Sequence, residues 1–379
     1  MNALLNIDME TVNRRILDRR KANRALPPYR AALTSEVTAV LADYFAKVQP
    51  GAEVSGVRRV GGGASKEQFF FTLTQGGKAE KFLLRMDPRM AITETDRARE
   101  FTLLDAMQGI VPVPEPAWVD AHAEHFPQSA AIMRVVNGVT KPTGASLKVT
   151  GLGTWLGDDL RAKLRDQFLD HLVAIHAYDW RANPLPGFDV PDADPKQAAR
   201  WSFNFWREMF EVDGGETLPI IALAEQWLAD NMPDTADLTL THGDYRTGNY
   251  LFEEGSGQIT ALLDWELARI GDFHEDLGWI LMQVFGTIDN GTFRASDLYE
   301  REEFIRAYEE RSGRTVNRKT LHYYDVMSSW KCYVIVGCNG LAAARSQHNH
   351  QDVLLTYLAA ATPMFTHDLV RLLGKGAPA

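Results

Sequence analysis

The feature of this sequence that most constrains its fold is a strand-rich stretch, residues 51–136, between two helical regions. Three segments in it have strand composition and are separated by glycine-containing turns: Val54–Val60, Gln68–Thr74 and Lys81–Met86. A helix is expected at Thr95–Met107, followed by a proline-rich connector and the apolar run Ala130–Val136. The stretch is therefore predicted to form an antiparallel sheet with one helix.

Apolar residues at helical spacing dominate the rest of the chain. Residues 1–50 contain two such segments, separated by Pro27 and Pro28. Beyond residue 136, this periodicity predicts six helices: Leu160–Tyr178, Trp201–Phe210, Ile220–Asn231, Glu302–Arg311, Leu321–Arg345 and Val353–Leu373. Two strand-like segments, Tyr250–Glu253 and Gln258–Asp264, interrupt them as a predicted hairpin.

The length of the chain indicates more than one folding unit. A chain of 379 residues is too long for a single hydrophobic core. We predict an α+β fold with a helical extension at residues 1–50, a small antiparallel-sheet lobe at 51–136 and a larger, mainly helical lobe at 137–379.

Composition and charge exclude some classes of function. The formal net charge of -10 argues against a general nucleic-acid binder, which usually has a basic face. Cys332 and Cys338 match no metal-ligand spacing or disulfide framework, which favours buried thiols in a reducing compartment. The first residues lack an apolar signal core, and Tyr333–Gly337 is far too short to cross a bilayer. We expect a cytoplasmic protein without nucleic-acid or membrane partners.

The residues that indicate chemistry lie close together in the sequence. His242, Asp244 and Asn249 fall within one short segment, and the predicted hairpin then leads to Asp264. Phosphoryl transfer needs a carboxylate that orients the attacking hydroxyl and accepts its proton, with ligands that hold Mg²⁺ on the phosphates. Asp244 suits the first role, and the oxygens of Asn249 and Asp264 are ligands that Mg²⁺ prefers. The alternative is that Asp244 and Asn249 only close a turn.

This segment resembles the aminoglycoside phosphotransferase and choline kinase group, relatives of the protein kinases with the same two-lobed architecture. The group's catalytic loop corresponds to residues 242–249, its metal-binding aspartate to Asp264, and its next pattern to Gly271–Leu277. The resemblance implies a protein-kinase-like fold in which Asp244 is catalytic and Asn249 and Asp264 bind Mg²⁺. One departure is Phe273, where many members have proline.

The resemblance also implies that the strand-rich stretch covers the nucleotide. Gly62 and Gly63 would let backbone N–H groups approach the triphosphate, and Ser65 would donate a further hydrogen bond. Arg85 occupies the place of the phosphate-binding lysine of protein kinases; it keeps the charge but presents a planar fork. Glu100 would be its ion-pair partner. The alternatives are a plain hairpin at the glycines and surface positions for Arg85 and Glu100.

Further residues follow from the same resemblance. The run ending in Arg134 and Val136 corresponds to the hinge, where adenine bonds to the backbone, so both are expected cofactor contacts. Lys66 is expected either to reach a phosphate or substrate, or to be a solvated loop lysine. His176, His242 and Asp276 are expected to be structural, with Asp276 accepting hydrogen bonds from the backbone of the catalytic loop.

These residues together predict a phosphotransferase that uses ATP or GTP and Mg²⁺ to phosphorylate a hydroxyl group of a small molecule. The runs Arg200–Trp201 and Asp276–Trp279 look like a subgroup often found fused to, or beside, acyl-CoA dehydrogenases, which favours a hydroxyacyl or other partly apolar acceptor. The alternatives are a catalytically silent kinase-like nucleotide-binding protein and an aminoglycoside- or choline-type kinase. A protein kinase is disfavoured because the H-R-D, D-F-G and A-P-E markers are absent.

The sequence says least about the acceptor site. Aromatic residues on the later helices offer it apolar or stacking surfaces, although helical aromatic stripes lie more often in the hydrophobic core than in a pocket: Trp201, Phe205, Trp206, Trp330 and Tyr333. Basic residues lie among them, and an acidic stretch at Glu208–Glu216 would instead suit a cationic acceptor. The oligomeric state is left open.

Overall fold

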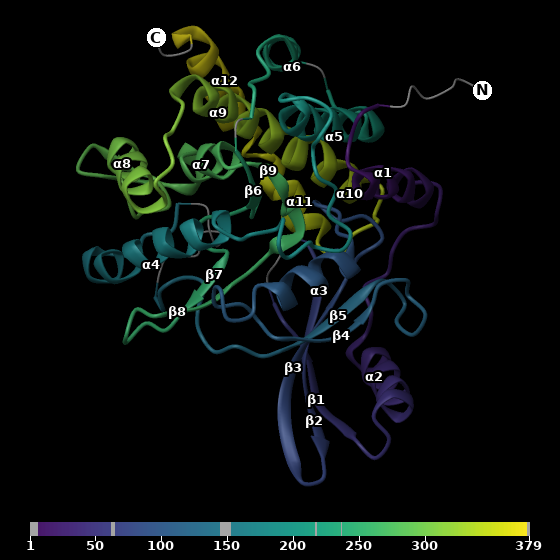
Figure 1. Ribbon diagram of the computed structural model, residues 1–379. Coiled ribbons are helices and arrows are strands. Elements are labelled where there is room, and N and C mark those ends of the chain that lie inside the picture. Colours follow the sequence, from purple (N-terminus) through teal and green to yellow (C-terminus); the bar gives the residue numbers. More distant parts are fainter. Residues whose placement is uncertain (1–6, 62–64, 145–152, 217, 236, 377–379) are drawn as a thin grey trace.

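The protein has two lobes, and the smaller one is built on an antiparallel sheet (Figure 1). The computed structural model describes residues 7–61, 65–144, 153–216, 218–235 and 237–376. Five strands lie in the order β1-β2-β3-β5-β4. Their bounds are Glu53–Arg59 for β1, Glu67–Gln75 for β2, Lys78–Met86 for β3, Pro116–Asp120 for β4 and Ala130–Arg134 for β5. Helix α3 (Arg97–Ala106) lies where the two lobes meet (Figure 1).

The alternation of side chains explains how this sheet buries one face. In β2 every second residue is buried, including Phe69 and Phe71, which is the period of a half-covered strand. These side chains pack with Leu41 and Phe45 of helix α2 (Thr34–Val48) in one core. The strands and the helix expected in this stretch are confirmed.

The connector before β5 differs from the expectation. Its second half forms β4, which pairs with β5 at the edge of the sheet. Proline is tolerated in edge strands and at their first residue, and Pro116 begins this one. Trp118 then packs on Phe45 and Phe82, with ring centroids 4.9 and 5.1 Å apart. The prolines therefore obscured a strand that tertiary packing stabilises.

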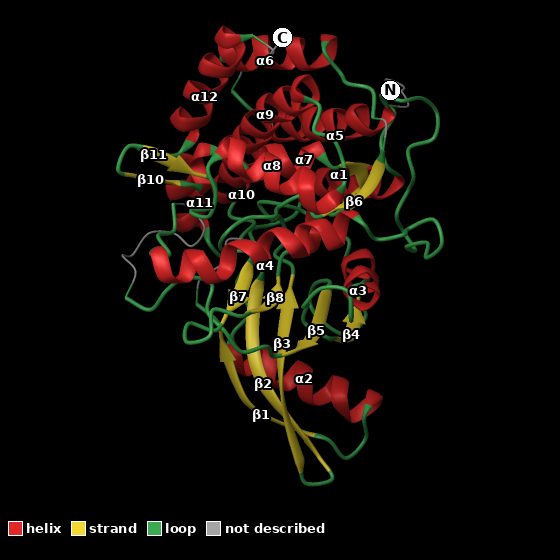
Figure 2. Ribbon diagram, turned by 60° about the vertical axis from the view of Figure 1, so that its left-hand side comes forward, coloured by secondary structure: helices red, strands yellow, loops and turns green. Residues whose placement is uncertain are grey.

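The larger lobe is mainly helical, as expected (Figure 2). Its helices are α4 Asp158–His176, α5 Gln197–Asp213, α6 Pro219–Asp230, α7 His274–Ile280, α8 Arg301–Ser312, α9 Arg318–Cys332, α10 Leu341–Arg345, α11 Asp352–Ala359 and α12 Thr362–Lys375. The expected helix Leu321–Arg345 is interrupted by a π-helical segment, Tyr333–Gly340. The expected helix Val353–Leu373 is two helices, because a break at Ala360 and Ala361 precedes Pro363.

Short strands in this lobe position the loops that carry chemistry. The expected hairpin is present as β7 (Tyr250–Phe252) and β8 (Ile259–Leu262). A second pair, β6 (Leu238–Thr241) and β9 (Arg269–Asp272), was not predicted. Residues 242–249 connect β6 to β7, and Asp264 follows β8 directly.

The two helices of residues 1–50 pack on different lobes. Helix α1 (Thr11–Asn23) lies against α5, and its Val12 and Ile16 belong to the core of the large lobe. Helix α2 belongs to the core of the small lobe. Arg20 of α1 is fully buried and ion-pairs with Asp213 of α5 and Glu94 of the small lobe, both at 2.6 Å. The division of the chain at residues 50 and 136 stays a prediction.

One described segment, Asp352–Lys375, has the length and composition of a membrane-crossing helix, with mean hydropathy 1.2. In the structure this segment is α11 and α12, which cover the large lobe. Its residues buried in the core are Leu355, Phe365, Leu369 and Leu372.

Candidate active site

The loop at residues 242–249, the expected catalytic loop, begins with a turn that requires glycine. Gly243 has a φ of +81°, in the region that disfavours residues with a Cβ. A Cβ there would lie 2.4 Å from the Leu267 carbonyl oxygen, so this position also has no space for a side chain. The close approach packs residues 242–249 directly against the segment that follows Asp264.

A single buried carboxylate fixes the start of this loop. Asp276 of α7 accepts hydrogen bonds from the backbone N–H groups of His242 and Gly243, both at 2.7 Å. Its Oδ2 also lies 3.0 Å from Nε2 of His176, whose Nδ1 bonds to Tyr308. Burial raises the pKa of Asp276, but the bond to His176 and the backbone donors outweigh it and lower the pKa overall. This geometry agrees with the structural parts expected for His176 and Asp276.

His242 faces the interior beneath the loop. It is fully buried, packs on the Trp265 ring at 4.4 Å, and its Nδ1 accepts a hydrogen bond from the backbone of Asp244. Burial lowers its pKa, although Asp276 and Asp244 oppose that effect. A neutral, buried imidazole braces the loop, as expected for this residue.

Three donors hold the Asp244 carboxylate. Oδ1 accepts from Nε1 of Trp279 at 2.7 Å and from Nε of Arg246 at 2.8 Å. Oδ2 accepts from Nδ2 of Asn249 at 2.6 Å. Sequence analysis did not single out Trp279 or Arg246. The sequence could have indicated Trp279, because it lies three residues after Asp276 on one helix and therefore on the same face.

Asn249 and Asp264 both lie next to this carboxylate. The Asn249 amide nitrogen donates to the Asp244 carbonyl as well as to its carboxylate, so the amide oxygen points in another direction. Asp264 has a left-handed backbone with φ 58° and a side chain that is 39% exposed. Burial around the site, with Glu266, Asp244 and Glu100 nearby, raises the pKa of Asp264 against the opposing effect of Arg85. Asp264 therefore lies in a cluster of carboxylates that Arg85 partly neutralises.

Arg85 joins the sheet to this cluster. Its guanidinium donates to Glu100 of α3 at 3.0 Å and to Asp264 at 2.7 Å. Arg85 and Glu100 are both buried. The ion pair expected between them is present, and the surface alternative for both residues is wrong.

Glu266 is a member of the cluster that sequence analysis missed. It accepts hydrogen bonds from Ser65 at 2.9 Å and from Thr93, and the ammonium of Lys66 lies 3.6 Å away. Burial raises the pKa of Glu266, but Lys66 and Arg85 lower it overall. Lys66 is fully buried and also pairs with Asp87 at 3.3 Å, so a solvated loop lysine is wrong.

The other expected nucleotide contacts lie at the edge of the small lobe. Gly62 and Gly63 fall outside the described residues. Ser65 follows them and bonds to Glu266. The Arg134 side chain forms ion pairs with Glu80 and, at 3.0 Å, with Glu115. Val136 follows β5, and its backbone N–H has no backbone acceptor in the described part of the chain.

The aromatic residues expected at the acceptor site are mainly core residues. All five are buried, and Trp330 is fully enclosed with its ring stacked on Phe203 at 5.5 Å. Trp201 donates to Asp8, with which Arg200 also ion-pairs, so both secure the extension. Helical aromatic stripes pack inward because this buries the most apolar area. The acidic stretch is also partly neutralised, since Asp213 pairs with Arg20.

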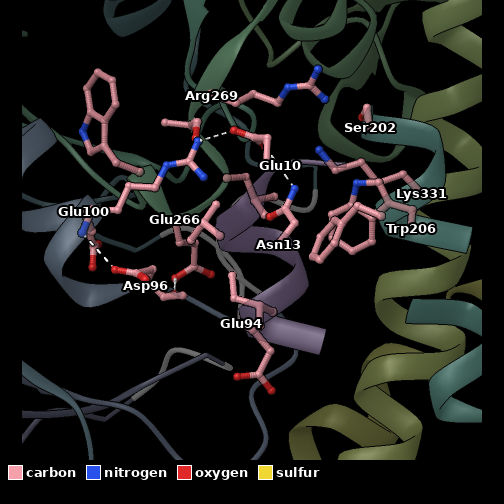
Figure 3. Close-up of a pocket in the computed structure, with 18 of the residues that line it drawn as sticks. Glu10, Asn13, Glu94, Asp96, Glu100, Ser202, Trp206, Glu266, Arg269 and Lys331 are labelled. Carbon is pink, nitrogen blue, oxygen red and sulfur yellow. Dashed lines mark hydrogen bonds and ion pairs between the residues drawn. The ribbon is translucent and has the colours of Figure 1, made fainter. Parts of the chain in front are cut away.

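Two hollows lie beside these elements. A cavity of about 40 Å³ is enclosed by α1, α3, α5, α9 and residues 265–269, and is lined by Glu266 and Lys331 among others (Figure 3). A larger cleft of about 610 Å³ is lined by the end of α5, the π-helical segment, α10 and α12. Tyr333 lines this cleft, and its hydroxyl donates to the Glu216 carbonyl.

The fold has two lobes, with an Arg–Glu pair beneath the small sheet and an Asp–Asn pair on a loop between short strands. These features together define a kinase-like protein. Residues 56–315 match the model of the phosphotransferase enzyme family, and the chain belongs to that family. The resemblance found in the sequence and the enzyme class, a phosphotransferase, are confirmed.

Curated relatives are larger proteins. The chain is 26% identical over 304 residues to acyl-CoA dehydrogenase family member 11 of Gallus gallus, covering 75% of this chain and 36% of that protein. It is 30% identical over 115 residues to acyl-CoA dehydrogenase family member 10 of Mus musculus, covering 30% of this chain and 10% of that protein. The chain thus spans only about a third of the first relative and less of the second.

Solved structures share the fold. A putative aminoglycoside phosphotransferase from Ralstonia eutropha has a TM-score of 0.66 at 20% identity, over 90% of this chain and 99% of that one. The phosphotransferase APH(4)-Ia, solved with AMP-PNP and hygromycin B, has a TM-score of 0.58 at 15% identity, over 88% and 98%. Choline kinase LicA from Streptococcus pneumoniae has a TM-score of 0.54 at 14% identity, over 89% and 99%. The expected kinase-like fold is confirmed.

Proposed function

We propose that the protein transfers the γ-phosphoryl group of ATP or GTP, with Mg²⁺, to a hydroxyl group of a small molecule in the cytoplasm. The observation that carries the proposal is the convergence of Asp244, Asn249 and Asp264 beside Arg85 and Glu100. These residues supply a proton acceptor, metal ligands and a phosphate-binding cation, which are the parts that phosphoryl transfer requires.

The donor set fits Mg²⁺. Asn249 uses its nitrogen on Asp244, which leaves the amide oxygen for a metal, and Asp264 is a partly exposed carboxylate. Among the described residues no group of three or more His, Cys, Asp or Glu side chains forms a metal site by itself. Asn249 and Asp264 would supply two oxygens, and the ion would take its other ligands from phosphate oxygens and water. Bound there, Mg²⁺ would neutralise charge on the phosphates.

The proton acceptor is Asp244. Trp279 and Arg246 occupy one of its oxygens, and Asn249 binds the other, so the carboxylate is held in one orientation. Such a carboxylate is prepared to orient an acceptor hydroxyl and take its proton as the phosphoryl group is transferred. Arg246 is the nearest cation to this carboxylate and is suited to the incoming phosphates.

The nucleotide is proposed to lie between the lobes. Arg85, oriented by Glu100, would contact the α- and β-phosphates. Gly62, Gly63 and Ser65 would cover the triphosphate. Backbone groups of Arg134 and Val136 would bond to the adenine or guanine ring.

For the acceptor we propose a partly apolar hydroxyl compound, with hydroxyacyl thioesters as the leading class. Trp279 lies against Asp244, and the Arg246 guanidinium covers the Phe285 ring at 4.8 Å, so aromatic side chains pack beside the reacting carboxylate. Asp213, within the acidic stretch, is neutralised by Arg20, which weakens the case for a polycationic antibiotic. The relatives named for acyl-CoA dehydrogenases also support an acyl acceptor.

A coupled assay for ADP or GDP release tests the proposal. Hydroxyl compounds are screened, with hydroxyacyl-CoA thioesters, choline and kanamycin among them. Asp244→Asn is expected to lower kcat by about 10²–10⁴-fold, because the proton acceptor is lost while the shape is kept. Asp237→Asn, at an exposed ion pair, is the matched control and should retain activity. Undiminished turnover by Asp244→Asn would remove Asp244 from the chemistry.

The metal ligands are tested separately by calorimetry. Asp264→Ala is expected to abolish the tightening of nucleotide binding by Mg²⁺, and Asn249→Ala to weaken it. If Mg²⁺ tightens nucleotide binding equally in wild type and Asp264→Ala, the metal lies elsewhere. Tight nucleotide binding by wild type without turnover of any hydroxyl compound would favour the second candidate, a silent nucleotide-binding protein.

A further inference from the structure

A lysine is buried beside the catalytic loop with little direct charge compensation. Lys331 of α9 is 2% exposed, and its ammonium donates to the Gly243 carbonyl at 3.1 Å. Within the described part of the chain, the carboxylate at ion-pair distance is Glu275, whose Oε1 lies 3.9 Å away, beyond hydrogen-bond length. Burying an ammonium group is unfavourable unless it is paired and hydrogen-bonded. The position of this charge therefore needs a further explanation.

Glu275 is committed mainly to other partners. Its Oε1 accepts a hydrogen bond from Ser202 at 2.9 Å, and its Oε2 lies 3.5 Å from Nη1 of Arg269. Figure 3 shows Ser202, Arg269 and Lys331 in one region of the cavity lining. Glu275 consequently balances the charge of the region as a whole without fixing the Lys331 ammonium in place.

Two indole rings also lie close to the ammonium. The Lys331 ammonium lies 4.4 Å from the centroid of the Trp279 ring and 5.4 Å from that of Trp206. Figure 3 shows Trp206 directly beside Lys331. A cation over an indole face is attracted to the negative face of the ring. The ammonium is thus held between a backbone carbonyl and aromatic faces.

Both main contacts of Lys331 lead to the catalytic carboxylate. Gly243 immediately precedes Asp244, so a bond to its carbonyl restrains the peptide that carries the carboxylate. Trp279 receives the ammonium on its ring face and donates its N–H to Oδ1 of Asp244 at 2.7 Å. A positive charge on the face withdraws electron density from the ring, which makes the N–H a stronger donor.

We propose that Lys331 is a positioning residue for phosphoryl transfer. Its ammonium fixes the Gly243 carbonyl and the Trp279 ring together, and through them it holds the Asp244 carboxylate in the orientation that accepts the proton of the acceptor hydroxyl. The inference rests on the proposed function of Asp244, and it assigns part of the catalytic geometry to a helix far from the loop in sequence.

The first test needs no substrate. Tryptophan is labelled with ¹⁵N, and the indole N–H resonance of Trp279 is identified by its loss in Trp279→Phe. Lys331→Met removes the charge and keeps a long, flexible side chain. The Trp279 resonance is expected to shift upfield, in the direction also produced by Asp244→Asn, because the bond to Oδ1 weakens. Lys319→Met, at an exposed position of the same helix, is the control and should leave the resonance unchanged.

The second test uses an acceptor found in the hydroxyl screen. Lys331→Met is expected to lower kcat by up to about 10²-fold, as for a misplaced catalytic group, with the nucleotide KM nearly unchanged. Lys331→Arg is expected to recover part of kcat because the charge is kept. A residue with a purely structural role would lower thermal stability without this split between kcat and KM, and without rescue by arginine.

The outcomes separate this inference from the proposed function. An unshifted Trp279 resonance in Lys331→Met, or a kcat equal to that of Lys319→Met, would overturn the inference. If wild type phosphorylates no compound, the proposed function fails, and the resonance alone decides whether Lys331 positions Asp244. If Lys331→Met does not fold, Lys331→Gln, which keeps a donor but loses the charge, is measured in its place with the same two outcomes.

Discussion

Replacing Asp276 by asparagine tests the central support of residues 242–249, the proposed catalytic loop. Asp276 is fully buried and accepts two backbone hydrogen bonds at 2.7 Å, with a third contact to His176 at 3.0 Å. Each hydrogen bond to a charged acceptor contributes about 1.5–3 kcal/mol. Asparagine keeps the shape but presents one nitrogen, so at least one backbone N–H faces another donor and stays unpaired at a cost of about 1–3 kcal/mol.

The expected loss is about 3–5 kcal/mol in the free energy of unfolding, as for a buried pair that loses one partner. This is a large part of the about 5–15 kcal/mol that usually stabilises a native protein. Urea unfolding followed by tryptophan fluorescence measures it, and an unchanged m-value shows that the transitions are comparable. Asp166→Asn is the matched control: that residue is 62% exposed and pairs with Arg311, so the loss should stay below about 1 kcal/mol.

The reasoning would be refuted by an Asp276→Asn variant within about 1 kcal/mol of wild type, since that loss is no larger than the one expected for a surface pair. In that case another group, or ordered water, satisfies the backbone N–H groups of His242 and Gly243. Asp276 would then not be the support of the loop.

Two further pairs of substitutions test the phosphate-binding cation and the packing around the site. Arg85→Ala should raise the nucleotide KM and lower kcat, and Arg85→Lys should recover part of both in the ADP-release assay, because the charge survives but the fork does not; normal use of ATP by Arg85→Ala would assign the phosphates to another cation. Gly278→Ala should destabilise the protein by about 1–3 kcal/mol in urea, because its Cβ would lie 2.8 Å from the Tyr324 carbonyl carbon. Gly374→Ala, whose Cβ meets nothing within 4 Å, should instead be neutral or stabilising by up to about 1 kcal/mol; equal effects of the two glycine substitutions would contradict the packing argument.

The features that were predicted best are those that depend on residues close together in the sequence. Asp244, Asn249 and Asp264 lie on one loop and one hairpin, so their convergence needs only local turns. The alternation in β2 and the periodicity of the helices are local patterns too. The pair β6 and β9 was missed because each strand has four residues and its partner is distant in the chain.

Some residues have surroundings that sequence reasoning could not assign, because their partners come from distant segments. Lys66 lies in a polar loop sequence, and its complete burial is explained by Asp87, Glu266 and the Thr93 carbonyl, which are distant from it in the chain. Lys331 looks like an ordinary charged position of a helix until α7 and the catalytic loop are placed against it. The aromatic stripe of α5 was consistent with both a core and a pocket, and packing decided for the core.

The extension at residues 1–50 has a mechanical consequence. Two lobes joined by a single chain segment can rotate relative to each other about many axes. Here the chain between α1 and α2 joins the lobes a second time, because α1 is seated on one body and α2 on the other. A second connection of this kind restricts how far two lobes can separate. Arg20 is fully buried and ion-pairs with Glu94 on one side and Asp213 on the other, so separating the two lobes at this point would require one of these ion pairs to break.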